Sequence, residues 1–134
     1  MTIRIRTAYA AIIAASALAA CTTETGPAYG PPTANTSATV TMTGLHFYPE
    51  ITHVKVGDTV EWRNQSSFTH SVNANPQRFP DDVSIPAGAA SFDSGRIAAG
   101  DVYRHTFTAP GTYRYVCLPH VDLGMSGTVI VEPR

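Results

Sequence analysis

Three side chains that bind soft metal ions lie close together near the C-terminus, on Cys117, His120 and Met125. A thiolate, an imidazole and a thioether are ligand types of a mononuclear copper site, in which two His and one Cys bind in a plane and a Met sits on a long axial bond. This loop contains only one imidazole, and His70, far upstream, is a candidate for the second. The residue types therefore predict a copper site formed by His70, Cys117, His120 and Met125.

The residues between these ligands suit a tight loop. Pro119 fixes a backbone φ angle and so stiffens the turn that brings the thiolate and the imidazole onto one ion. Gly124 allows the backbone to fold back, which lets the thioether of Met125 approach the ion. Taken singly, such residues are more often a buried inert thiol, a surface imidazole and a core thioether. Their order and spacing, together with a distant His on a strand, favour the metal site.

The N-terminus has the composition of an export signal. Met1–Arg6 contains two arginines, and Thr7–Ala20 is almost entirely apolar or small. At about 14 residues this apolar stretch is too short to span a membrane as a helix. The sequence Leu-Ala-Ala before Cys21 resembles a bacterial lipobox, in which the Cys is acylated and becomes the mature N-terminus. We expect a lipoprotein signal peptide over 1–20 and lipidation of Cys21, with a plain signal peptide as the alternative.

The cysteine content supports the metal site independently of spacing. The chain has two cysteines, and if Cys21 carries a lipid then Cys117 has no disulfide partner. An unpaired thiol in an oxidising envelope is a liability unless it is used, as it is in a metal site. Residues 21–37 are small, polar and rich in Pro and Gly, which predicts a flexible linker. The expected location is the periplasmic side of the cell envelope, with the lipid as the membrane contact.

Residues 38–134 have the pattern of an all-β domain. Short runs of β-branched and aromatic residues alternate with turn residues, and no stretch keeps a helical apolar period. This pattern predicts a sandwich or barrel. The stretch 74–90, with three prolines, is expected to form a long loop over one edge. The strands are expected at Ala38–Met42, Thr52–Val56, Thr59–Arg63, His70–Asn73, Ser91–Ser94, Val102–Thr108, Gly111–Cys117 and Gly127–Val131.

The loop spacing and several flanking segments resemble the cupredoxin family of small blue-copper proteins, in its plastocyanin and amicyanin branch. The spacing Cys-x2-His-x4-Met is that of plastocyanins. Family-like segments occur in the right order at Gly44–Pro49, Val56–Trp62, Phe92–Gly95 and Gly127–Val129. The resemblance covers residues 38–134 and implies an eight-stranded Greek-key β-sandwich with one type 1 copper near one end.

The resemblance also implies which residues surround the ligands. Ser71 stands where the family usually has an Asn that links the two ligand loops, and its backbone N–H is expected to reach the Cys sulfur. Asn64 and Pro119 are expected near the ligands as well. The edge of the His120 ring is expected to reach the surface, and electrons would enter or leave there among Leu45, Pro119 and Leu123. Val116 replaces a Tyr found in plant-type plastocyanins, so the photosynthetic partner is not transferred.

These observations predict a tethered electron carrier. Four protein ligands leave copper no position for a substrate, so we expect no enzyme activity. The expected partners are redox proteins of the envelope that dock transiently on a monomer, and the formal net charge of −1, without a basic stripe, gives no indication of nucleic-acid binding. The alternatives are a copper-delivery lipoprotein of the envelope, a copper enzyme and a metal-free adhesion sandwich. His46, His53 and His105 are expected to be exposed to solvent.

Overall fold

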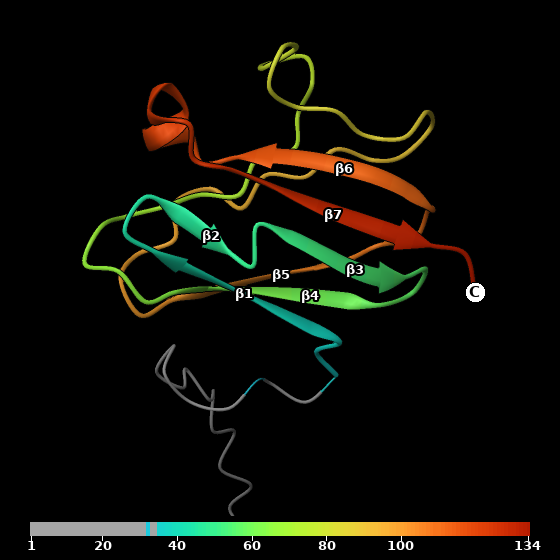
Figure 1. Cartoon of the computed structure of the whole chain (residues 1–134), viewed down its shortest axis with the longest axis horizontal. Coiled ribbons are helices and arrows are strands. Elements are labelled where there is room, and N and C mark those ends of the chain that lie inside the picture. Colours follow the sequence, from blue (N-terminus) through green and yellow to red (C-terminus); the bar gives the residue numbers. More distant parts are fainter. Residues whose placement is uncertain (1–31, 33–34) are drawn as a thin grey trace, which may run out of the picture.

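The computed structural model describes Pro32 and residues 35–134, which form two β-sheets packed face to face (Figure 1). The all-β sandwich predicted from the sequence is confirmed. The expected signal peptide over 1–20, the lipidation of Cys21 and most of the expected linker lie outside the described residues. Within the part of the chain that is described, no helix is long and apolar enough to cross a membrane.

The first sheet has four strands in the order β2-β1-β4-β5. β1 (Ala38–Thr43) pairs antiparallel with β2 (His46–Tyr48) and parallel with β4 (Thr59–Asn64). β5 (Val102–Thr106) pairs antiparallel with β4 and forms the far edge. The parallel β1–β4 pair brings the C-terminal ends of both strands to the same end of the sandwich.

The second sheet has three strands in the order β3-β7-β6. β3 (Ile51–Lys55) is parallel to β7 (Ser126–Glu132), and β6 (Gly111–Val116) is antiparallel to it. Between β6 and β7 lies the short 3₁₀ helix η1 (Leu118–Leu123), which Figure 1 shows in orange-red at one end of the sandwich. Side chains alternate along β3, since Thr52 and Val54 are buried while Ile51, His53 and Lys55 are exposed.

The strand count differs from the expectation, because the described residues form seven strands rather than eight. β2 was not predicted, and the strands expected at His70–Asn73 and Ser91–Ser94 are wrong. In these segments only isolated residues pair, His70 with Ile97 and Asn73 with both Asp93 and Val116. Successive residues face different neighbours, so no continuous ladder forms. The two segments therefore join neither sheet as a strand.

The core is built around Trp62 of β4, whose side chain is fully buried between the sheets. Tyr115 of β6 meets the indole edge-on at a centroid distance of 5.5 Å, and Phe92 and Phe107 lie 6.2 and 6.4 Å away. Each such aromatic pair contributes about 0.5–1.5 kcal/mol beyond the area that it buries. This cluster joins β4 to β6, which are the strands that lead into the two predicted ligand loops.

The expected loop over residues 74–90 is present and crosses one edge of the second sheet, where Figure 1 shows it in yellow-green above β6. Its contact with that edge is a bridge in which Ser84 and Arg114 exchange backbone hydrogen bonds of 3.4 and 2.8 Å. Val83 is buried and anchors the loop to the core. The loop therefore covers the free edge of β6.

Candidate metal centre

The loop after β6 positions three of the four predicted ligands. β6 ends at Val116, Cys117 follows in an extended conformation, and η1 begins with Leu118. Gly124 ends η1 with a left-handed φ of 78°, which an L side chain rarely adopts and which reverses the chain before Met125. The expected role of this glycine is consistent with that geometry.

Backbone hydrogen bonds close this loop on itself. The N–H of His120 donates to the carbonyl of Cys117 at 3.0 Å, and the N–H of Met125 donates to the carbonyl of His120 at 3.2 Å. The N–H of Cys117 in turn donates to the carbonyl of Met125 at 3.0 Å. The three predicted ligands are thus tied to one another through their main chain, and the Met125 side chain is buried.

His70 reaches the same end of the sandwich from the other sheet. It follows the connection that leaves β4, which Figure 1 shows in green at the same end of the sandwich as η1. Its N–H donates to the carbonyl of Ile97 at 3.0 Å, and the N–H of Ile97 donates back at 2.8 Å. This bridge holds a fully buried imidazole against the loop that carries Cys117.

The side chains of His70, Cys117 and His120 converge, with one donor atom of each within 4.8 Å of the others. The Nδ1 atoms of His70 and His120 lie 3.5 and 3.3 Å from the Cys117 sulfur. Bonds of about 2.0 Å to imidazole and about 2.3 Å to thiolate would place nitrogen and sulfur roughly 3.6 Å apart on a shared ion. The spacing and the soft donor set fit a copper ion.

Ser71 links the two ligand segments through both its backbone and its side chain. Its N–H points at the Cys117 sulfur at 3.4 Å, and its hydroxyl oxygen accepts a 2.8 Å hydrogen bond from the N–H of Leu118. The serine therefore makes the side-chain link to the other loop that the resemblance associates with an Asn. Pro119 lies in the first turn of η1 with an exposed ring, so its influence on the ligands is through the backbone of the turn.

The electrostatics of the cluster also suit a cation. Burial raises the pKa of the Cys117 thiol, and the N–H of Ser71 opposes this shift only in part. Burial, together with the neighbouring His120, lowers the pKa of His70 and keeps its imidazole neutral, which is the form that binds metals. A thiolate at this buried position needs a positive partner, and a bound metal ion supplies one.

Comparison with known proteins identifies the family. A sequence model described as copper binding proteins of the plastocyanin/azurin family matches residues 34–132. The chain belongs to this family. The predicted copper cofactor is confirmed by that membership together with the converging His70, Cys117 and His120.

Relatives and solved structures agree with this assignment. The chloroplastic plastocyanin of Tetradesmus obliquus is 36% identical over 88 residues, which are 66% of this chain and 59% of that protein. The plastocyanin of Scenedesmus fuscus is 35% identical over 88 residues, which are 66% of this chain and 88% of that protein. A reduced mutant of amicyanin is 29% identical with a TM-score of 0.60, covering 82% of this chain and 95% of that chain. A Cu(I) form of another amicyanin mutant is 30% identical with a TM-score of 0.60, covering 80% and 90%.

The residues that contact the ligands differ in part from those expected from the sequence. Asn64 is fully buried at the end of β4, but its side chain bonds to Ser66 and Phe68 of the connection after β4 and to the carbonyl of Ile97, not to a ligand. The direct contact is made by Ser66, whose hydroxyl oxygen lies 2.7 Å from Nε2 of His70. Sequence reasoning missed Ser66, and its one sequence signal is a hydroxyl four residues before the His.

The surface near His120 is apolar. The His120 ring is partly exposed, and Phe68 lies edge-on to it at a centroid distance of 6.5 Å with 54% of its own surface exposed. Leu123 is 65% exposed, Pro119 is exposed and Leu45 is partly buried. We call Phe68 together with Pro119, His120 and Leu123 of η1 the apolar end, and the place of Leu45 beside it stays a prediction. Sequence reasoning missed Phe68, which was visible there only as an isolated aromatic residue in a polar connection.

The other histidines divide into two kinds. His46 and His53 are exposed, as expected, and Nδ1 of His53 lies 3.4 Å from a Glu132 carboxylate oxygen. The exposure expected for His105 is wrong, because its ring stacks on Phe92 at 4.2 Å and is only partly accessible. This position of β5 faces the core aromatics, and burial lowers the pKa of His105.

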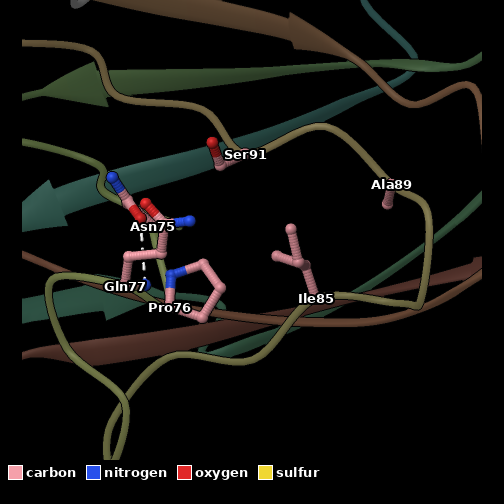
Figure 2. Close-up of a pocket in the computed structure, with 6 residues that line it drawn as sticks. All are labelled: Asn75, Pro76, Gln77, Ile85, Ala89 and Ser91. Carbon is pink, nitrogen blue, oxygen red and sulfur yellow. Dashed lines mark hydrogen bonds between the residues drawn. The ribbon is translucent and has the colours of Figure 1, made fainter.

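A separate hollow of about 210 Å³ lies under the 74–90 loop (Figure 2). Its lining carries amide, hydroxyl and apolar groups but no ionisable side chain, and none of the predicted ligands takes part. The hollow is therefore distinct from the metal centre. The lining residues are Asn75, Pro76, Gln77, Ile85, Ala89 and Ser91.

Proposed function

We propose that this protein is an electron carrier that holds one type 1 copper through His70, Cys117, His120 and Met125. The observation that supports this most directly is the convergence of two imidazole Nδ1 atoms on a buried thiol, at 3.5 and 3.3 Å. When bound, copper would supply a one-electron couple between Cu(II) and Cu(I). Four protein ligands leave no position for a substrate, so the proposal includes no enzyme activity.

The contribution of the chain is to hold the ligands still. The carbonyl and N–H groups of Cys117, His120 and Met125 are paired with one another, and Ser71 ties the loop to the segment of His70. Ligands that are fixed in this way move little when the charge at the site changes. A small rearrangement favours rapid electron exchange over release of the ion.

The apolar end is the proposed place of electron entry and exit. His120 is the ligand whose ring is partly exposed, and Phe68 and Leu123 present exposed apolar surface beside it. A small apolar contact forms and separates quickly, which suits a carrier that changes partners. The proposed partners are redox proteins of the cell envelope, and the carrier is proposed to act as a monomer.

The proposed location follows from the N-terminal sequence. Residues 1–20 would direct export, Cys21 would carry the lipid and residues 21–37 would tether the domain 38–134 to the membrane. At about 3.3 Å per residue such a tether extends at most roughly 50 Å. The domain would then meet its partners close to the membrane, on the periplasmic side.

The test is a visible and EPR spectrum of the chain titrated with Cu(II), with Cys117→Ser as the matched variant and a redox titration of the wild type. We expect an intense thiolate-to-copper band that is lost in the variant and bleaches reversibly on reduction. A colourless wild type, or copper that dissociates on reduction, would overturn the electron-carrier proposal. Dissociation on reduction would instead support copper delivery in the envelope.

A further inference from the structure

We propose that Ser66 is a positioning residue for the metal centre, which accepts a hydrogen bond from Nε2–H of His70 and so turns Nδ1 of that ring toward Cys117. The inference rests on the proposed copper function, since it concerns how one ligand of that site is held. It is carried by hydrogen bonds among Asn64, Ser66 and His70, whose donors and acceptors can be assigned one after another.

The positions of the oxygen and the nitrogen in the Asn64 side-chain amide follow from its backbone partners. Its Nδ2 lies 2.6 Å from the carbonyl of Phe68 and 3.0 Å from the carbonyl of Ile97, and both groups can only accept. Its Oδ1 lies 3.0 Å from the backbone N–H of Ser66, which can only donate. The amide of Asn64 therefore has its oxygen on the Ser66 side.

The Ser66 hydroxyl has one proton and several neighbours. Oδ1 of Asn64 lies 2.8 Å from the hydroxyl oxygen, and the carbonyl of Phe68 lies 3.2 Å from it. Both neighbours are pure acceptors, and the shorter contact with Asn64 is the better place for the proton. If the proton pointed at His70 instead, two acceptor oxygens would lie 2.8 Å apart with no proton between them.

The hydroxyl oxygen then only accepts in its other contacts, from the N–H of Phe68 at 3.2 Å and from a donor on His70. Nε2 of this ring is 2.7 Å from the hydroxyl oxygen, so Nε2 carries the proton. The neutral imidazole has one N–H, which leaves Nδ1 with its lone pair, 3.5 Å from the Cys117 sulfur. The hydroxyl thus selects the tautomer that a metal ion needs before any ion binds.

The frame behind this hydrogen bond is rigid. Asn64 is fully buried, its backbone exchanges hydrogen bonds of 3.0 and 2.9 Å with Asp101 and Gly100, and its amide shares the Ile97 carbonyl with the N–H of His70. A hydrogen-bond partner on the outer nitrogen of a ligating His fixes the ring orientation and raises its basicity. Because a more basic imidazole stabilises Cu(II) more than Cu(I), Ser66 should lower the reduction potential.

The first test needs no variant and no copper. In the metal-free chain at pH 8, ¹⁵N chemical shifts of the His70 ring should report a protonated Nε2 and an unprotonated Nδ1. Because Ser66→Ala removes the acceptor, it should mix the two tautomers. A wild-type His70 that is protonated on Nδ1 would overturn the proposal, whatever the protein does with copper.

The second test uses the copper-loaded chain. We expect Ser66→Ala to bind Cu(II) about tenfold more weakly, the low end of what such partners contribute. If Cu(I) binding is unchanged, a tenfold loss raises the potential by about 59 mV for one electron. Ser66→Thr keeps a hydroxyl and should restore the potential. Ser67→Ala, a change at the exposed neighbouring serine, should leave the potential at the wild-type value.

The outcomes separate the two proposals. A chain that forms no blue copper site fails the proposed function, while the tautomer measurement still judges the role of Ser66. A blue chain in which Ser66→Ala loses stability but keeps the wild-type tautomer and potential would show that the serine is only structural, and the positioning role would be wrong.

Discussion

Ser71→Ala should loosen the loop that carries Cys117 and His120. Its hydroxyl oxygen accepts a 2.8 Å hydrogen bond from the Leu118 N–H, and only 2% of the serine is exposed to solvent. The alanine leaves that N–H without its acceptor, at a cost of about 1–3 kcal/mol. The backbone N–H of residue 71 still points at the sulfur, so the variant isolates the side-chain link from the backbone contact.

The assay compares urea unfolding of the metal-free chain with Cu(II) affinity and the charge-transfer band of the loaded chain. Ser94→Ala is a matched control, because the Ser94 hydroxyl accepts a hydrogen bond of the same length, 2.8 Å, from the N–H of Val72. Both variants should lose about 1–3 kcal/mol of stability. Only Ser71→Ala should also weaken copper binding and shift the band, since Ser94 bonds to Val72, beyond His70, while Ser71 bonds to the loop that carries Cys117. Ser71→Asn should recover the copper properties in part.

Two results would refute this reasoning. If Ser71→Ala unfolded at the wild-type urea concentration, the Leu118 N–H would be satisfied in another way, and the linking role would be wrong. If both variants altered the copper band equally, the effect would come from general loosening of the sandwich. The decisive quantity is therefore the difference between the two variants in copper affinity at equal loss of stability.

Three further predictions concern the core, the pH response and the surface. Gly127→Ala should destabilise the chain by about 1–3 kcal/mol or more in urea unfolding, because a Cβ there would lie 2.5 Å from Cζ of the buried Tyr115 ring. Burial makes the pKa of His105 lower in the folded chain than in the unfolded chain. As the pH falls, this imidazole is therefore protonated first in the unfolded chain. The stability that it contributes is present above its unfolded pKa and is lost as the pH falls. The metal-free wild type should therefore lose more stability between pH 8 and pH 5 than His105→Phe, whose ring keeps the stacking on Phe92. Phe68→Ala should slow electron self-exchange measured by NMR severalfold at an unchanged potential, and an unchanged rate would exclude Phe68 from the electron-transfer surface.

Six strands could be predicted from the sequence to within two residues at each end, because their runs of β-branched and aromatic residues alternate with turn residues and each run forms one continuous ladder. Two expected strands failed for a reason that alternation cannot reveal. The segment from His70 to Asn73 has the side chains of a strand, but its backbone pairs with Ile97 at one end and with Asp93 and Val116 at the other. β2 was missed because three residues are too few for a period.

The ligands could be predicted from the sequence, whereas the residue that positions one of them could not. Cys117, His120 and Met125 were predictable because thiolate, imidazole and thioether groups are uncommon and their spacing on one loop is chemically meaningful. Ser66 was not, because serine is common in polar connections and nothing local distinguishes it from Ser67. Only the fold shows that one hydroxyl faces Nε2 of His70 while its neighbour is exposed.

The two connections that carry the ligands, after β4 and after β6, are hydrogen-bonded to each other in the metal-free chain. β4 leads to Asn64 and His70, β6 leads to Cys117, and Asn73 and Val116 exchange backbone hydrogen bonds of 2.9 and 3.0 Å between the two paths. The Trp62–Tyr115 contact joins the same strands inside the core. The sandwich fixes where each connection begins. One hydrogen bond to each of two serines, Ser66 and Ser71, is then enough to orient the ligands. The loop that carries Cys117 can then be closed, and the imidazole of His70 oriented, in the metal-free chain. Ser71→Ala and Ser66→Ala are therefore expected to change copper binding through geometry that is measurable without copper.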